Sequence, residues 1–116
     1  MYTICKSFEF SAAHSLPHLH DGHRCRNVHG HTYTVQVLLR ASVLAPSGMV
    51  RDFGELSELK TYISQRMDHA NLNTLIENPT AENLAKHLYD VCVAKWPDTQ
   101  AVRVWESPRS WAQYSR

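Results

Sequence analysis

Two segments near the N-terminus alternate between apolar and polar residues, and this pattern constrains the fold more than any other feature of the chain. In residues 2–13 the apolar positions are Tyr2, Ile4, Phe8 and Phe10; in residues 29–41 they are Tyr33, Val35, Val37 and Leu39. Because successive side chains of a strand point to opposite faces, each segment predicts a strand with one face on a core. The 116 residues are enough for one such core, which predicts a single domain spanning residues 1–116.

Three histidines fall on the apolar faces of these two predicted strands. His14 continues the face of the first strand at its end, and His29 and His31 begin the face of the second. In an antiparallel hairpin the end of one strand lies beside the start of the next, so the three imidazoles should converge. Burying them without partners would be unfavourable, and a metal ion removes that cost. Three neutral nitrogen ligands with a free fourth position are typical of catalytic zinc, which predicts a Zn²⁺ site at His14, His29 and His31. The alternative is three surface or hydrogen-bonded histidines at strand ends.

The rest of the chain predicts two helices followed by two short strands. A polar loop covers residues 15–28, and Pro46-Ser47-Gly48 marks a turn. The first helix should begin at Asp52, with Glu55 completing a capping box. The second should be capped by Asn78 or Thr80 and end at Trp96, before Pro97. Strands are expected at 100–106 and 111–115.

The predicted order ββααββ defines an α+β fold: an antiparallel sheet with both helices on one face. A sheet of four strands in so small a chain leaves two edges open. Because open edges are usually covered or paired, the pattern predicts oligomerisation through strand pairing.

Cys25 lies in the loop between the first two strands, near the predicted metal site and close to Arg24 and Arg26. Positive surroundings favour the thiolate, which makes Cys25 a candidate nucleophile or base. The same thiol as a fourth ligand would instead make the zinc site closed and structural. The two arginines predict either a solvated, partly cationic loop or an anion-binding rim next to the metal, since arginine can make bidentate contacts to phosphate.

An Asp68-His69 pair follows the first helix, and Glu106 continues the buried face of Val102 and Val104. An aspartate can orient an imidazole for proton transfer, although the end of a helix explains the same dipeptide. A buried glutamate needs a partner, either a protein cation or a ligand with two N–H donors, unless it reaches solvent at the strand end.

Bulk properties exclude several classes of function. The formal charge is +1 and the basic residues are scattered, which argues against nucleic-acid binding. No apolar run approaches the length of a membrane span, and residues 1–10 do not resemble a signal peptide. Three widely spaced cysteines predict no disulfide framework, so a cytoplasmic location is expected.

Taken together, these motifs resemble the 6-pyruvoyltetrahydropterin synthase superfamily. The spacing from Cys25 to the His-Gly-His triplet is most similar to the bacterial branch, the 6-carboxy-5,6,7,8-tetrahydropterin synthases of queuosine biosynthesis. The resemblance covers nearly the whole chain in order, and its motifs are Phe10-Ser11-Ala12-Ala13-His14, Cys25-x-x-x-His29-Gly30-His31, Asp68-His69, Pro79-Thr80-Ala81-Glu82-Asn83 and Glu106.

The resemblance implies a tunnelling fold (T-fold), in which the sheets of three subunits join into a barrel and two barrels stack as a homohexamer. It implies a cytoplasmic lyase that converts 7,8-dihydroneopterin triphosphate to 6-carboxytetrahydropterin, acetaldehyde and triphosphate. It also implies zinc on the three histidines, Cys25 as the catalytic thiol, Asp68 and His69 as a proton relay, and Glu106 with Thr80 as pterin-binding residues. The alternatives are 6-pyruvoyltetrahydropterin synthase activity and a zinc-binding module without catalysis.

Overall fold

The first two strands pair over their full lengths. A computed structural model describes all 116 residues. Strand β1 (Tyr2–His14) and strand β2 (His29–Ala41) form an antiparallel ladder that runs from Tyr2 opposite Ala41 to His14 opposite His29. Strands β3 (Thr99–Ser107) and β4 (Ser110–Ser115) follow in the order β1-β2-β3-β4. The predicted antiparallel sheet of four strands is therefore confirmed.

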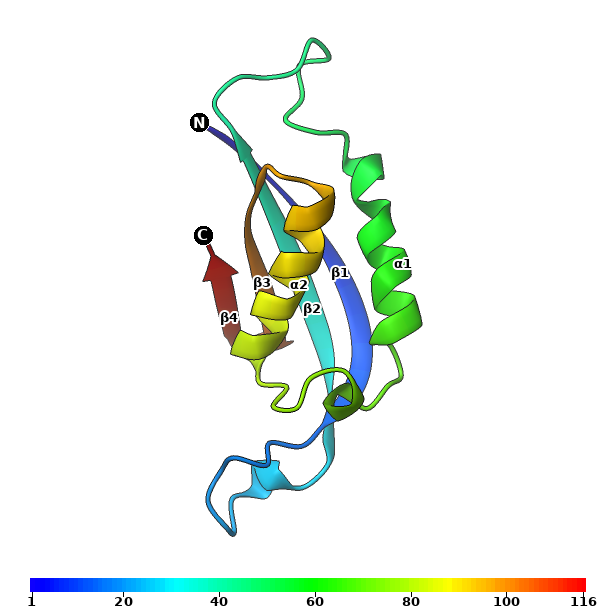
Figure 1. Cartoon of the computed structure of the whole chain (residues 1–116), viewed down its shortest axis with the longest axis vertical. Helices are drawn as coiled ribbons and strands as arrows, with labels where there is room; N and C mark the ends of the chain where they lie inside the picture. The colour runs from blue at the N-terminus through cyan, green and yellow to red at the C-terminus, as the bar shows by residue number, and fades with distance from the viewer.

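Two helices cover one face of this sheet (Figure 1). Helix α1 (Ser57–Arg66) lies beside β1, and helix α2 (Ala81–Lys95) lies over β3 and β4. A single core of 21 buried residues forms between the helices and the sheet. It includes the predicted apolar faces, Phe8 and Phe10 from β1 and Tyr33, Val35, Val37 and Leu39 from β2. The alternation of the sequence thus sets which face of each strand is buried.

The predicted start of the first helix is wrong in detail. Asp52 does act as an N-cap, but it accepts a 2.8 Å hydrogen bond from Gly54 N–H and caps the short 3₁₀ helix Phe53–Leu56. The Glu55 carboxylate accepts a 2.9 Å hydrogen bond from Arg51 instead of closing a capping box. At the second helix, Thr80 is the cap, because its hydroxyl accepts from Asn83 N–H at 3.1 Å.

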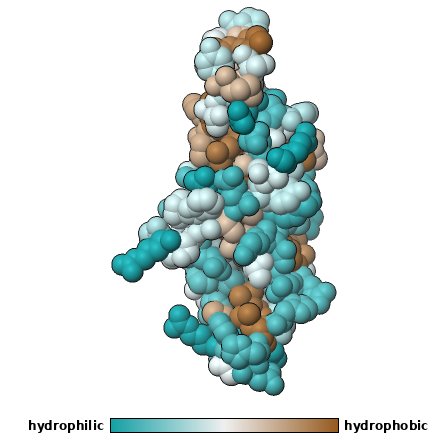
Figure 2. Space-filling model, turned by 90° about the vertical axis from the view of Figure 1, so that its left-hand side faces the viewer, coloured by the Kyte–Doolittle hydropathy of each residue, from teal (hydrophilic) through white to brown (hydrophobic).

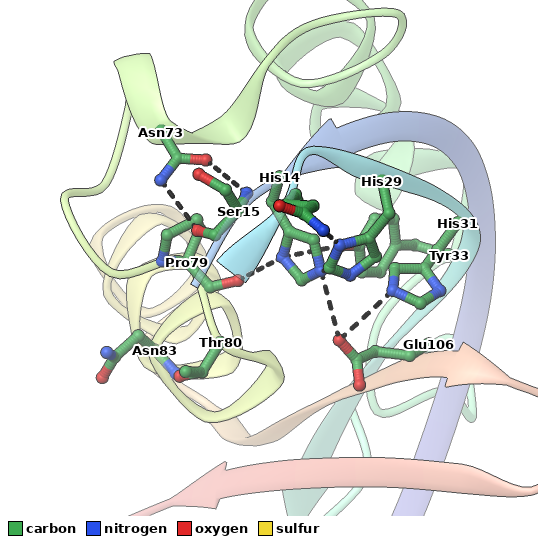
Figure 3. A network of polar contacts seen from close by, with 11 residues as sticks. His14, Ser15, His29, His31, Tyr33, Asn73, Pro79, Thr80, Asn83 and Glu106 are labelled. Atoms are coloured by element: carbon green, nitrogen blue, oxygen red, sulfur yellow. Dashed lines mark hydrogen bonds and ion pairs between the residues drawn. The ribbon is translucent and has the colours of Figure 1, made fainter. Parts of the chain in front are cut away.

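A β-bulge interrupts the pairing of β3 with β4 at Glu106. Trp105 pairs with Trp111 and Ser107 with Ser110, which leaves Glu106 as the extra residue. Bulges locally bend a strand and change the direction of the side chain that they carry. Here the bulge lies on the part of β3 that approaches the histidine end of the β1–β2 hairpin (Figure 3).

The single chain is elongated, with extents of 55 × 24 × 24 Å. Its radius of gyration of 15.2 Å exceeds the roughly 13 Å expected of a compact domain of about 100 residues. The loops at 15–28 and 42–51 extend from opposite ends of the sheet (Figure 1). Seen from the side of β4, the surface is mostly hydrophilic but carries separate hydrophobic patches along its length and near both ends (Figure 2).

The outer edge of β1 is paired at one end only. Ser11 C=O accepts from His69 N–H at 2.6 Å, and Ala13 N–H donates to Ala70 C=O at 3.0 Å. Backbone groups of alternate residues point outward, and those of Thr3, Cys5, Ser7 and Glu9 have no backbone partner on this side. An unpaired edge of this length is available to another strand.

Candidate metal centre and active site

His14, His29 and His31 converge at the end of the β1–β2 hairpin, as predicted. His14 lies opposite His29 in the ladder, and Ala12 lies opposite His31. One nitrogen from each ring lies within 4.8 Å of the other two. Figure 3 shows the three rings turned toward one another at the edge of the core. The period of the strands and the register of one hairpin are sufficient to produce this cluster.

Backbone carbonyls fix the tautomers of two of these rings. His14 Nδ1–H donates to Pro79 C=O at 2.7 Å, and His29 Nδ1–H donates to Asn27 C=O at 2.8 Å. Each ring therefore presents the lone pair of its Nε2 to the cluster, and these two atoms are 2.9 Å apart. Two facing lone pairs repel each other unless they share a proton or bind a metal ion. Metal-binding histidines are commonly oriented by such a hydrogen bond from their other ring nitrogen.

Burial keeps His14 in the form that binds a metal. The ring is fully buried, and this desolvation lowers the pKa of His14 below its ordinary value of 6.5. The Tyr33 hydroxyl lies 3.2 Å from His14 Nδ1, and burial raises the pKa of Tyr33 well above 10.0. Three imidazoles whose ligand nitrogens face one point fit a zinc ion with a free fourth coordination position.

Glu106 is the acidic residue nearest to this cluster. Its Oε2 lies 3.7 Å from His14 Nε2 and 3.7 Å from His31 Nε2. Its side chain is 29% exposed, and neither lysine nor arginine forms an ion pair with it. The sequence left open whether the partner of Glu106 is a protein cation or a ligand. Within this chain, its only ion-pair contacts are with His14 and His31.

Cys25 lies on a short 3₁₀ turn, Arg24–Arg26, in the loop between β1 and β2. Its N–H donates to His23 Nδ1 at 3.0 Å, and its C=O accepts from Leu16 N–H at 2.9 Å. Its sulfur is not part of the cluster formed by the three histidine nitrogens. The thiol is half-buried and forms no disulfide.

Arg26 holds this loop in place from within. Its Nη1 donates to Pro17 C=O at 3.0 Å and to Leu19 C=O at 2.6 Å, and it lies 3.6 Å from Asp21. All three contacts are made by this one nitrogen, and both Arg24 and Arg26 are exposed. Sequence reasoning missed this structural role because Arg26 acts on carbonyls seven to nine residues away.

The Asp68-His69 pair lies at the outer edge of β1. Asp68 Oδ1 accepts from Ser11 N–H at 3.0 Å, and this bond, more than the neighbouring imidazole, holds the pKa of Asp68 below 3.8. The other carboxylate oxygen is 3.1 Å from His69 Nδ1. His69 has φ of 58° and a side chain that is 83% exposed. His69 and His31 line the same surface depression of about 500 Å³.

Thr80 and Asn73 lie on the segment that leads into α2. The Thr80 hydroxyl caps this helix, directly after the Pro79 carbonyl that binds His14. Asn73 binds both backbone groups of Ser15: its Oδ1 accepts at 2.8 Å and its Nδ2 donates at 2.9 Å. Asn73 was not predicted as a site residue, and the only sequence signal was its place in Asn71-Leu72-Asn73, after the Asp-His pair.

Comparisons with known proteins identify the family. Residues 3–116 match the family model described as 6-pyruvoyl tetrahydropterin synthase. The chain is 38% identical over 111 residues to a putative 6-carboxy-5,6,7,8-tetrahydropterin synthase of Archaeoglobus fulgidus, covering 95% of this chain and 92% of the relative. It is 36% identical over 122 residues to the 6-carboxy-5,6,7,8-tetrahydropterin synthase of Synechocystis, covering 98% and 93%. The Caenorhabditis elegans 6-pyruvoyl tetrahydropterin synthase structure matches with a TM-score of 0.86 and 28% identity, over 99% of this chain and 95% of that one.

The chain therefore belongs to the 6-pyruvoyl tetrahydropterin synthase family. This confirms the predicted family, the tunnelling-fold class of the subunit and the prediction of an enzyme. Neither helix of the chain has both the length and the apolar character needed to cross a bilayer.

Proposed function

We propose that this chain is a zinc-dependent 6-carboxy-5,6,7,8-tetrahydropterin synthase of queuosine biosynthesis. Its substrates would be 7,8-dihydroneopterin triphosphate and one water molecule, and its products 6-carboxytetrahydropterin, acetaldehyde and triphosphate. The observation that carries the proposal is the pair of facing Nε2 atoms of His14 and His29, each oriented by a carbonyl, with His31 alongside. The names of the two relatives described above support the choice of reaction.

His14, His29 and His31 would hold the zinc ion. When bound, zinc polarises the side-chain hydroxyls of the substrate and stabilises negative charge that develops on them. The polar contacts of Pro79 and Asn27 keep the ligand rings in place without further reorganisation.

Cys25 would remove a proton from carbon as a thiolate, and His69 would donate or accept the second proton. Asp68 Oδ2 lies 3.1 Å from His69 Nδ1, which supports a role for this carboxylate in orienting the imidazole. His69 is mostly exposed in the single chain, which supports a site that is completed by a neighbouring subunit. Glu106 can accept two hydrogen bonds from the ring N–H and the amino group of a pterin, and Thr80 lies at the same end of the sheet.

The proposed assembly is a cytoplasmic homohexamer built as a dimer of trimers. The unpaired outer edge of β1 at Thr3–Glu9 supports strand pairing between subunits. Light scattering at micromolar concentration should give the mass of six chains, and a monomeric mass would contradict this part of the proposal.

The reaction is tested by incubating the purified chain with 7,8-dihydroneopterin triphosphate and measuring acetaldehyde. Release of one acetaldehyde per 6-carboxytetrahydropterin formed is expected. A 6-pyruvoyl product without acetaldehyde would favour 6-pyruvoyltetrahydropterin synthase activity. This is the first alternative, and it is the activity for which the C. elegans neighbour is named. Zinc binding with neither product would favour the non-catalytic module.

A further inference from the structure

The Glu106 carboxylate lies directly over two of the three histidines, on the open side of the cluster. We propose that Glu106 is a displaceable fourth ligand, which occupies the open metal position when no substrate is bound and leaves it when a pterin ring binds. This inference rests on one part of the proposed function, the presence of a metal ion on the histidines.

The distances to the histidines suit a metal ligand. Nitrogen or oxygen ligands of tetrahedral zinc lie at about 2.0–2.2 Å, which places neighbouring ligand atoms roughly 3.4 Å apart. Glu106 Oε2 lies 3.7 Å from both His14 Nε2 and His31 Nε2. It is not within 4.8 Å of every donor in the cluster, so it lies on the side of His14 and His31, away from His29. To act as the fourth ligand, the carboxylate would have to move toward His29.

The local backbone directs Glu106 to this place. As the extra residue of the β3–β4 bulge, Glu106 has no partner on β4 that would fix its position in the ladder. In Figure 3 its side chain leaves β3 toward the histidine rings. Bulges are common next to active sites because they redirect one side chain without disturbing the rest of the sheet.

The charges of the site favour the position of the Glu106 carboxylate beside the histidines. Glu106 has no lysine or arginine partner, and its side chain is only 29% exposed. Three neutral imidazoles leave the full 2+ charge of zinc in a partly buried site, and one carboxylate halves it. The Nδ1 atoms of His14 and His29 are bound to carbonyls, so of the three rings only His31 remains free to change its tautomer and donate to Glu106 when no metal is present.

The two roles of Glu106 exclude each other. A carboxylate oxygen that binds the metal cannot also present both oxygens to the two N–H donors of a pterin. Recognition of the ring would therefore withdraw Glu106 from the metal and open the fourth position for the substrate's side chain. Because such coupling is reciprocal, a pterin ring should weaken metal binding and the metal should weaken ring binding.

The test uses the full chain loaded with Co²⁺, whose visible absorption reports its ligands, in the absence of substrate. Replacing Glu106→Gln keeps the size of the side chain and removes its charge. Cobalt affinity, measured by competition with a chelator, should fall by about 10–100-fold, and the absorption bands should shift. The control is Glu82→Gln. Glu82 lines a small pocket together with Glu106, and its replacement should change neither the cobalt affinity nor the absorption bands. Glu106→Asp retains the charge on a shorter side chain, so its affinity should fall between those of the parent and Glu106→Gln.

Addition of pterin itself, which has the ring but no side-chain hydroxyl groups, provides the second measurement. It should shift the cobalt spectrum of the parent toward that of Glu106→Gln and leave the spectrum of Glu106→Gln unchanged. Equal affinities and spectra for the parent and Glu106→Gln, with one cobalt per chain in each, would overturn this inference and leave the proposed function intact. If the parent bound no cobalt, or bound it equally well after His29→Ala, the metal site of the proposed function would itself fail.

Discussion

The two halves of the candidate site differ in how completely one chain builds them. His14 and His29 are oriented by carbonyls of the same chain, His31 lies beside them, and His14 is fully buried. Cys25 and His69 lie on a loop and at a strand edge, and the His69 side chain is 83% exposed. A single chain therefore brings the three candidate metal ligands together, whereas the His69 side chain, a proposed proton-transfer group, stays mostly exposed.

The largest effect is expected when one of the three candidate zinc ligands is removed. His29→Ala removes one of three ligands and should lower zinc affinity by more than about 100-fold, since even loss of an outer contact costs about 10–100-fold. Turnover should fall to background. Metal analysis after dialysis measures the change, and His18→Ala, an exposed loop histidine, is the matched control. Unchanged zinc content in His29→Ala would contradict the ligand assignment.

The second expected effect separates the two halves. Cys25→Ala should lower turnover by about 10²–10⁴-fold, because it removes the proposed base, and should leave one zinc per chain. Cys5→Ala, an exposed thiol on β1, serves as the control for both measurements. Loss of zinc from Cys25→Ala would instead show a closed, structural metal site.

A smaller effect, on stability, is expected at Asn73, which lies between the histidine cluster and the Asp68-His69 pair. Asn73 binds both backbone groups of Ser15, the residue after His14, and lies on the segment that follows His69. Asn73→Ala leaves these two groups without partners and should lower the free energy of unfolding by about 1–3 kcal/mol. Urea denaturation measures this loss. Asn83→Ala, whose exposed amide makes one 2.8 Å bond to Asn78 C=O, should cost less, and an equal cost would show that Asn73 has no special role.

The smallest expected effect is on the pH dependence of stability and arises from Asp68, beside the exposed His69. The pKa of Asp68 is lowered in the folded chain, mainly by Ser11 N–H, so its charged form stabilises the fold. This contribution is complete above the ordinary pKa of 3.8 and is lost as the pH falls through the lower pKa of the folded state. In Asp68→Asn the urea midpoint should therefore fall less steeply than in the parent as the pH drops below about 4. A profile as steep as that of the parent would contradict the role of the Ser11 contact.

Much of the metal centre could be predicted because strand geometry is regular. A period of two residues puts His29 and His31 on one face, and the hairpin puts His14 beside His29. The carbonyl of Pro79, 65 residues from His14, was not predictable, because no local pattern links them. Alternation predicted that Glu106 shares the face of Val102 and Val104, whereas the bulge at this residue was not predicted, because it depends on the pairing with β4.

The capping error at Asp52 has a similar cause. The sequence predicted a capping box, but the side chain of Glu55 contacts Arg51, which also binds Asp98 at 2.8 Å. Such a contact depends on the tertiary fold. Local sequence rules therefore predicted the faces of the strands better than they predicted the ends of the helices.

X-ray absorption at the zinc edge of the purified chain tests the central claim most directly, because it counts the ligands by element. The account predicts only nitrogen and oxygen neighbours at about 2.0–2.2 Å, with a multiple-scattering pattern of three imidazoles. A sulfur neighbour at about 2.3 Å would place Cys25 on the metal and contradict an open catalytic centre.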